Sequence, residues 1–133
     1  MNTSNLDSLY KNNEKFEKEG IWFSVSDDTA FLVRRFGGYN SHKVKSAMAR
    51  YYKPYARMIE LGTLGEEKER EIMLKVFIES SIVGWRGVKI DEKEVEYTFD
   101  AAFNLLKKLP DLADSLLAYA SESKNYREEL GNS

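Results

Sequence analysis

The sequence contains no cysteine and a single histidine among its 133 residues. Without cysteine the chain cannot form disulfides, use a thiol nucleophile or bind a metal through thiolates. No hydrophobic run approaches the roughly 20 residues that a membrane-spanning helix needs. Residues 1–5 have neither the basic nor the apolar segment of a secretory signal, so we expect an intracellular, cytoplasmic protein.

Catalytic and metal-binding residue patterns are also scarce. His42 lies between Ser41 and Lys43 at an expected helix start, beside like charge and without a neighbouring nucleophile or orienting acid. Spaced Asp-x-Asp loops, His-Glu motifs and Gly-Lys-Ser/Thr phosphate loops do not occur in the sequence. We therefore expect no enzymatic activity, no cofactor, no metal site and no small-molecule substrate.

The overall composition is that of an ordinary globular protein. Hydrophobic residues make up 42% of the chain and charged residues 32%. The length suits one hydrophobic core, and the sequence has no internal repeats or linkers. We expect a single domain over residues 1–133, in which residues 1–19 and 121–133 are loosely ordered.

Charge is distributed unevenly, although the net charge is only −2. Residues 29–59 contain seven Lys or Arg and no acid, whereas residues 60–133 contain sixteen acids and ten bases. Tyrosines are interleaved with the bases from Arg34 to Arg57, a combination that can hold single-stranded nucleic acid. One interpretation is therefore a small nucleic-acid-binding accessory protein, which the mildly acidic whole chain disfavours. The alternatives are a basic face that docks an acidic partner, or self-complementary association as a homo-oligomer.

The segment from Thr63 to Gly87 is predicted to be the central helix. Thr63 is followed three residues later by Glu66, which is the pattern of a capping box. Six of the seven residues in 72–78 are apolar, so this helix must be covered on most faces. Gly87 can adopt the left-handed conformation that ends a helix, which places Gly84 inside the last turn, where a neighbouring backbone approaches closely.

The elements around this helix are predicted from alternating apolar residues, from helix-capping residues and from helix-breaking Pro and Gly. Alternating apolar residues predict a β-hairpin over 21–36 that turns at residues 27–28. An amphipathic helix starts at Asn40-Ser41, breaks near Pro54 and ends at Gly62. A loose helix over 6–18 precedes these elements, and Gly20 ends it.

The C-terminal part of the chain is predicted to hold a short hairpin and two helices. The hairpin turns at residues 91–94. Thr98 caps a fourth helix, and Pro110 opens a fifth. The fold class is α+β, mainly α, with an N-terminal β-hairpin packed on a small bundle of four to five helices.

Six short motifs occur along the chain in a defined order and spacing. They are Phe36-Gly37-Gly38-Tyr39-Asn40, Tyr52-Lys53-Pro54-Tyr55-Ala56-Arg57, Thr63-Leu64-Gly65, Ile82-Val83-Gly84-Trp85-Arg86-Gly87-Val88, Leu105-Leu106-Lys107-Lys108-Leu109-Pro110-Asp111-Leu112 and Asn125-Tyr126-Arg127. As an ordered set they resemble the small tail assembly chaperones of long-tailed bacteriophages and prophages. The resemblance covers about residues 20–127.

The resemblance implies a non-enzymatic protein made in the cytoplasm of the infected or lysogenic bacterium and absent from the mature virion. It implies two partners: the tape-measure protein, a long and largely helical client that is kept soluble, and the tail-tube protein that assembles around it. The turns at 27–28 and 91–94 lack the glycine that is usual in the family.

A chaperone of this kind needs apolar surface that is exposed or readily uncovered. Under this function we expect no membrane or nucleic-acid partner. The alternative for Tyr51, Tyr55 and Trp85 is that they belong to the core. The candidate partner-binding residues, anchors at helix edges plus the basic residues that would steer an acidic partner, are Trp22, Arg34, Arg35, Arg50, Tyr51, Tyr55, Arg57, Met58 and Trp85.

Overall fold

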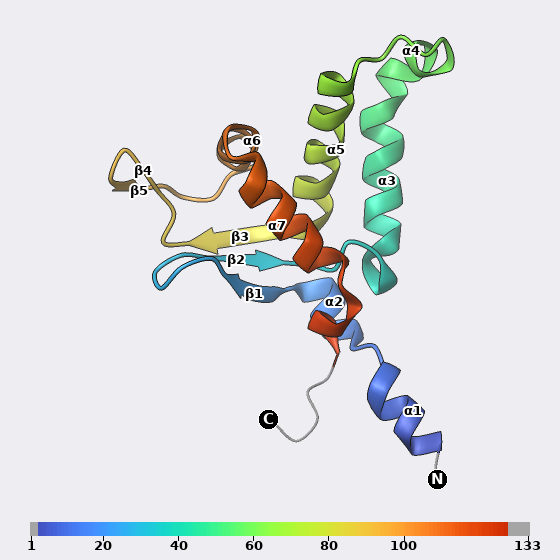
Figure 1. Ribbon diagram of the computed structural model, residues 1–133, viewed down its shortest axis with the longest axis vertical. Helices are drawn as coiled ribbons and strands as arrows, with labels where there is room; N and C mark the ends of the chain where they lie inside the picture. The colour runs from blue at the N-terminus through green and yellow to red at the C-terminus, as the bar shows by residue number, and fades with distance from the viewer. Residues whose placement is uncertain (1–2, 128–133) are drawn as a thin grey trace.

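A three-stranded antiparallel sheet lies below a group of helices in this structure, a computed structural model that describes residues 3–127 (Figure 1). Its strand order is β1-β2-β3, and a separate two-stranded hairpin consists of β4 and β5. The strands are β1 (Ile21–Ser24), β2 (Ala30–Val33), β3 (Ile82–Arg86), β4 (Lys89–Ile90) and β5 (Lys93–Glu94).

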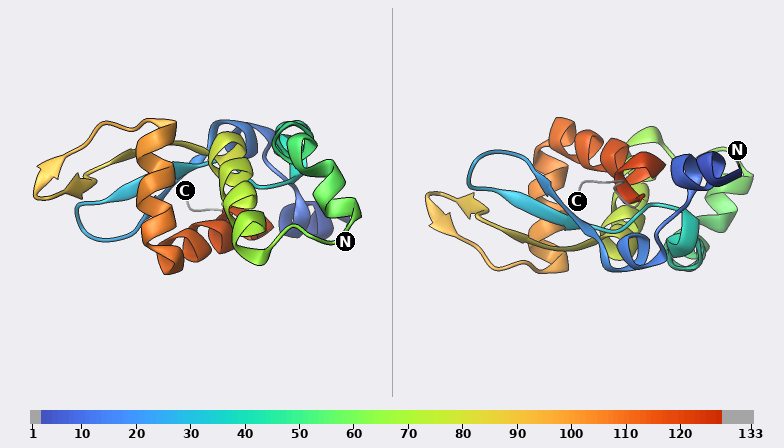
Figure 2. Two further views of the ribbon diagram at one scale, coloured as in Figure 1. Left: turned by 90° about the horizontal axis from the view of Figure 1, so that it is seen from above. Right: turned by 90° about the horizontal axis from the view of Figure 1, so that it is seen from below.

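Helices account for most of the chain. Figure 2 shows α5 between α3 and α6. The predicted class, α+β and mainly α with a β-hairpin packed on helices, is confirmed. In chain order the helical segments are α1 (Thr3–Tyr10), α2 (Glu14–Glu19), η1 (Gly38–Asn40), α3 (Ser41–Tyr52), η2 (Lys53–Tyr55), α4 (Ala56–Glu60), α5 (Glu66–Ser81), α6 (Phe99–Lys108), α7 (Pro110–Ser121) and η3 (Ser123–Tyr126).

The core lies between one face of the sheet and helices α5, α6 and α7. In β1 the half-buried Ile21 and Phe23 alternate with exposed residues, as a strand with one packed face requires. Phe31 on β2 is fully buried and meets the ring of Trp85 on β3 edge to face. From α5, Phe77 joins the same core cluster.

The middle of α5 is enclosed, as predicted for the central helix. Val76, Phe77 and Ile78 are each 2% exposed or less. Helices α3, α6 and α7 and strand β3 pack around α5. The apolar run therefore finds cover on most of its circumference.

The predicted C-terminal end of the central helix is wrong. The helix stops at Ser81, and Ile82–Arg86 forms strand β3, which pairs with β2. Ser80 and Ser81 are weak helix formers, and the segment after them contains β-branched and aromatic residues that favour a strand. The free edge of β2 supplies the backbone hydrogen-bond partners of this segment. Gly84 lies opposite Leu32 in this ladder and faces open space, so it marks no close backbone approach.

The predicted capping box and the predicted role of Gly87 are also corrected. Gly65 is the N-cap of α5, without a side-chain hydrogen bond, and the Thr63 hydroxyl instead donates to the Met58 carbonyl at 3.3 Å. Gly87 does have a positive φ of 73°, but it follows a strand. A Cβ atom there would lie 1.8 Å from the carbonyl oxygen of Asp28, so the tip of the β1–β2 hairpin requires this glycine.

Other local predictions are confirmed. The helix that begins at Ser41 is interrupted by η2 at Pro54, and the Thr98 side chain accepts a hydrogen bond from the Ala101 N–H at 3.0 Å. Pro110 opens α7. The second hairpin turns at Asp91 and Glu92 with φ values of 54° and 66°, the positive pair that a tight two-residue turn needs.

Both ends of the described chain contain packed side chains. Residues 3–19 form two helices instead of the single one predicted over 6–18. Glu17 and Tyr126 each have no exposed surface. The Tyr126 hydroxyl donates to the Val33 carbonyl at 3.0 Å, which fixes the C-terminal segment to β2. For residues 1–2 and 128–133 our expectation of loose order lies outside the described residues.

Candidate functional site

An apolar groove of about 370 Å³ opens between α5 and the α6–α7 pair, and we call it the α5–α7 groove. Phe77 and Leu106 are core residues that reach it, and Met73, Leu74 and Leu117 are half-buried along it. Its apolar lining consists of Met73, Leu74, Phe77, Leu106, Pro110, Ala113 and Leu117, and its charged lining of Glu67, Arg70, Glu71, Lys107 and Asp114.

The rim of the groove carries both signs of charge. Glu71 on α5 accepts from Lys107 of α6 at 3.0 Å and lies 3.6 Å from Lys68. The hydrogen bond from Lys107 lowers the pKa of Glu71. Glu67, Arg70 and Asp114 complete the charged lining. An apolar cleft with such a rim can take an apolar side-chain row flanked by charges of either sign.

Three of the predicted partner-binding residues line a smaller depression of about 210 Å³ between α3 and α5. Arg50, Tyr51 and Tyr55 meet there, but Arg50 forms an ion pair with Glu79 and the Tyr51 hydroxyl donates to the same carboxylate at 2.7 Å. Burial, together with the Glu79 carboxylate, raises the pKa of Tyr51 to about 12. The ammonium of Lys68 lies 5.6 Å from the ring centre of Tyr55.

The two tryptophans occupy the sheet, away from these helices. Trp85 on β3 donates its indole N–H to the Val95 carbonyl at 2.8 Å and packs edge to face on Tyr97. Trp22 on β1 is 42% exposed, and the guanidinium of Arg86 stacks over its ring at 4.5 Å. Trp85 is thus half-buried and hydrogen-bonded within the chain, whereas Trp22 has an exposed side chain.

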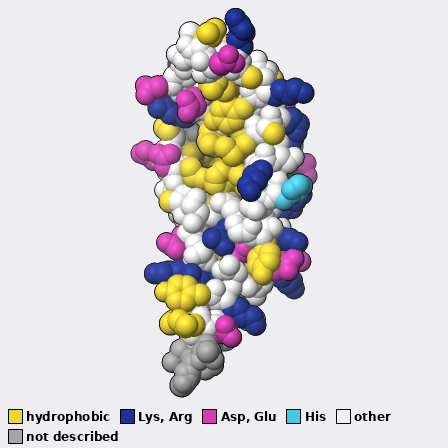
Figure 3. Space-filling view, turned by 90° about the vertical axis from the view of Figure 1, so that its right-hand side faces the viewer, with side chains coloured by type: hydrophobic (Ala, Val, Ile, Leu, Met, Phe, Trp, Pro, Cys, Tyr) yellow, Lys and Arg dark blue, Asp and Glu magenta, His cyan; other side chains and the backbone are white. Residues whose placement is uncertain are grey.

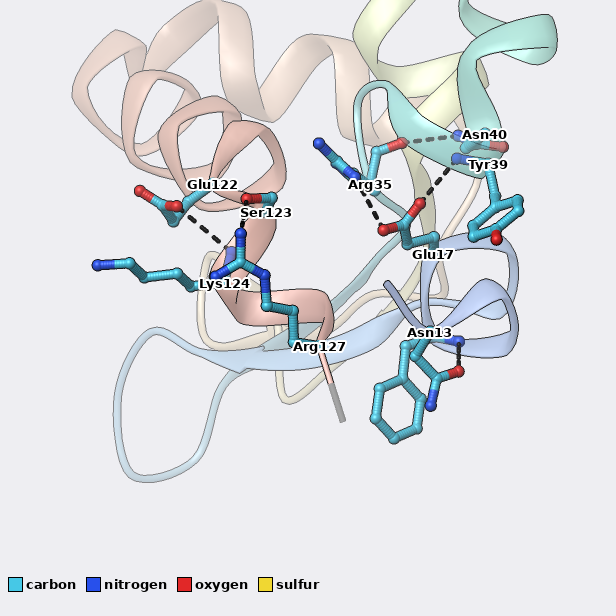
Figure 4. Close-up of polar contacts among 10 residues, drawn as sticks. Asn13, Glu17, Arg35, Tyr39, Asn40, Glu122, Ser123, Lys124 and Arg127 are labelled. Carbon is cyan, nitrogen blue, oxygen red and sulfur yellow. Dashed lines mark hydrogen bonds and ion pairs between the residues drawn. The ribbon is translucent and has the colours of Figure 1, made fainter. Parts of the chain in front are cut away.

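Arg34 and Arg35 bind the N-terminal helix α2. The Arg34 Nε donates to the Lys18 carbonyl at 2.7 Å. Arg35 donates to the buried carboxylate of Glu17 at 2.8 Å, and the Tyr39 N–H donates to its other oxygen at 2.7 Å (Figure 4). Both arginines make structural contacts that the sequence did not indicate.

Arg57 and Met58 lie on α4, at the end of the molecule opposite α1 (Figure 1). Met58 is 42% exposed, and its neighbours Ile59 and Leu61 are similarly open. On the face that Figure 3 shows, hydrophobic side chains gather over the upper half, with acids mostly on one side and Lys or Arg mostly on the other. The structure therefore divides the nine candidate residues among four places: the α3–α5 depression, the sheet, the contact with α2, and α4.

The groove itself was not found from the sequence. The available signal was the width of two apolar faces: the enclosed run 72–78, and the α7 stripe of Leu112, Ala113, Leu116 and Leu117. Each of these apolar faces is wider than a single neighbouring helix can cover. A sequence pattern does not say which part of such a face stays open.

Other potential sites lack supporting geometry in residues 3–127. His42 is exposed on the first turn of α3. In this part of the chain no group of three or more His, Cys, Asp or Glu is placed to hold a metal ion. None of the described helices combines the length and the apolar character needed to cross a membrane.

The chain matches the model of a known protein family. The model of the YdaY prophage protein family matches residues 39–132. This region contains α3 to α7 and therefore every residue of the α5–α7 groove. No curated protein and no solved structure matches the chain.

Proposed function

We propose that this chain, which belongs to the YdaY prophage protein family, is a non-enzymatic tail assembly chaperone that holds the tape-measure protein in the bacterial cytoplasm. In this proposal it also helps to recruit tail-tube subunits. A prophage origin and the ordered motifs that resemble tail assembly chaperones support the assignment. The observation that carries it is the α5–α7 groove, an apolar cleft that the described chain leaves open.

A largely helical client presents apolar side chains at positions i, i+3 and i+4 along its surface. Such a row docks into a hydrophobic groove between helices, and flanking charges set its orientation. The half-buried Met73, Leu74 and Leu117 would contact the row, while Glu67 and Arg70 would meet charges beside it. Holding a client in this way needs no reacting group.

The test is co-expression with a fragment of the tape-measure protein encoded by the same prophage. The natural chain should keep the fragment in the soluble fraction. Met73→Glu with Leu117→Glu should abolish this effect, because each substitution puts a carboxylate into the groove. Leu61→Glu is the matched control, since Leu61 is 60% exposed on the chain's surface and does not line the groove. A fragment that stays soluble with the groove variant, which circular dichroism shows to be folded, contradicts the proposal.

The basic residues are proposed to steer an acidic partner. Within the described chain, Arg35 and Arg50 form ion pairs, whereas none is found for the exposed Lys53 and Arg57. Lys53→Glu with Arg57→Glu should slow client capture at low salt while the melting temperature stays unchanged. Equal capture rates would rule out steering.

The nucleic-acid alternative makes a different prediction. It requires binding to single strands that weakens steeply with salt. We expect no such binding, because Arg34, Arg35 and Arg50 already contact groups of this chain. Tight, salt-sensitive binding of an oligonucleotide would favour the alternative.

A further inference from the structure

Helix α1 carries an apolar surface that residues 3–127 leave mostly exposed, although the Arg127 guanidinium lies 5.0 Å from the ring centre of Tyr10. Leu6, Leu9 and Tyr10 are 63%, 57% and 64% exposed. Their spacing of three and four residues places them on one side of the helix, and we call them the α1 ridge. Figure 1 shows α1 projecting from the body near the N-terminus. A row of large apolar side chains at this spacing is the form in which a helix enters a groove.

The α1 ridge and the α5–α7 groove lie in different parts of the molecule. The groove lies along the N-terminal half of α5, at the upper end of Figure 1, and α1 lies at the lower end. Only residues 11–13 separate α1 from α2, and three extended residues span roughly 10 Å. The buried ion pair of Glu17 with Arg35 fixes α2 to the body. The ridge therefore cannot reach the groove of its own chain.

The groove has room for part of the ridge and carries charges of both signs. A cavity of roughly 150 Å³ accommodates a benzene ring, so the groove of about 370 Å³ has room for about two side chains of the ridge. Asp7 and Lys11 lie one helical turn apart beside the ridge. The groove lining presents Arg70 for the carboxylate and Asp114 for the ammonium.

We propose that the α1 ridge of one copy docks into the α5–α7 groove of a second copy. The contact is head-to-tail, because each copy uses one surface and leaves the other free. The remaining ridge and groove can add further copies or, in an antiparallel pair, dock with each other and close a dimer. An eight-residue helix buries far less than the roughly 1,200 Å² of a stable interface, so the association is weak and concentration-dependent.

This inference goes beyond the proposed function, and it can hold or fail without it. In the chaperone proposal, the ridge of a second copy would cover the groove until a client displaces it. The experiment below contains no client. A failure here therefore leaves the co-expression test untouched, and the reverse is equally true.

Sedimentation equilibrium of the full chain over a wide concentration range tests the proposal. The average mass of the natural protein should rise with concentration, to that of a dimer if the remaining ridge and groove dock with each other and beyond it if they add further copies. Leu6→Glu with Leu9→Glu should give a monomer, and these exposed positions leave the core intact. Met73→Glu with Leu117→Glu should also give a monomer, and Ala113→Gln is a milder second variant that fills the groove.

Mixing the ridge variant with the groove variant gives the sharpest readout. One intact ridge and one intact groove remain in the mixture, so one-to-one pairs should form and should not extend. Leu61→Glu should associate like the natural chain. A natural chain that stays monomeric throughout, a ridge variant that associates normally, or a mixture that fails to pair would each overturn the proposal.

Discussion

Glu17 is the most deeply buried charged side chain among the described residues, and its partners explain why it is tolerated. Arg35 donates to one of its oxygens at 2.8 Å and the Tyr39 N–H to the other at 2.7 Å. Asn40 extends the contact by donating to the carbonyls of Arg35 and Ser80, both at 2.9 Å. The carboxylate thus joins α2 to the loop after β2, and Asn40 links that loop to the end of α5.

Removing the arginine should cost far more than removing the pair. Arg35→Met leaves Glu17 buried without its counter-charge, which we expect to lower the free energy of unfolding by about 3–5 kcal/mol. The double variant Glu17→Met with Arg35→Met should lose less free energy of unfolding than the two single variants lose together. Urea unfolding of all four proteins measures this difference, and strict additivity would show that the pair is not coupled.

Glu79 provides a pH-dependent contribution to stability. The hydrogen bond from Arg50, and the weaker one from Tyr51, hold the pKa of Glu79 below its ordinary value. A lowered folded-state pKa means that the ionised group stabilises the fold above its unfolded pKa of about 4.3. This contribution is lost as the pH falls through the folded-state pKa.

Glu79→Gln should therefore lower the melting temperature at neutral pH and approach the natural protein in acid. The pair is partly exposed, so the neutral-pH loss should stay below about 1 kcal/mol. Arg50→Gln should show the same convergence, because it removes the main cause of the shift. Melting curves between neutral pH and pH 3 measure this trend, and a gap that widens in acid would contradict it.

At the scale of the element, α5 and α6 begin in different ways. Thr98 caps α6 through its side chain, whereas α5 begins at Gly65 without such a bond. Thr63 stays with the preceding turn, where its hydroxyl meets Met58. The same residue type thus has two roles, although both lie shortly before a helix.

Thr98→Ala should destabilise the protein by about 1 kcal/mol, because the Ala101 N–H loses its acceptor. Thr63→Ala is the matched control and should change stability by less than about 0.5 kcal/mol, since its long hydrogen bond is exposed. Guanidinium unfolding of both variants checks the contrast. Equal losses would show that Thr63 supports α5 after all.

At the scale of the whole molecule, the two ends of the described chain differ in how they are held. Tyr126 has no exposed surface and bonds to Val33 of β2. Helix α1 leaves its large apolar side chains open at the other end. Burial thus ties the C-terminal segment to the core, while α1 stays largely exposed apart from the contact of Tyr10 with Arg127.

Two truncations should separate these roles. A chain that ends at Ser121 lacks the buried Tyr126 ring and should lose at least about 3–5 kcal/mol of stability. A chain that begins at Lys11 lacks α1 and should keep its melting temperature within a few degrees. Differential scanning calorimetry of both chains makes the comparison. A large loss from the N-terminal truncation would show that α1 contributes to the fold.

The candidate site was only partly accessible from the sequence. Composition and motifs indicated a protein that binds partners, and the structure places exposed Arg57, Met58 and Trp22 on its surface. Trp85 and Arg35 look equally suitable in the sequence but bond within the chain. Whether a large or charged side chain already bonds within its own chain depends on groups that are far away in the sequence.

The sequence by itself determined the local features: the β1–β2 hairpin, the break at Pro54, the cap at Thr98, the start of α7 at Pro110 and the covered middle of α5. Each of these features is predicted from residues within a few positions of one another. Only the tertiary structure decided that residues 82–86 form a strand, because the free edge of β2 completes their hydrogen bonds. It also decided which apolar face stays open, because the α5–α7 groove exists only where helices distant in sequence meet without closing.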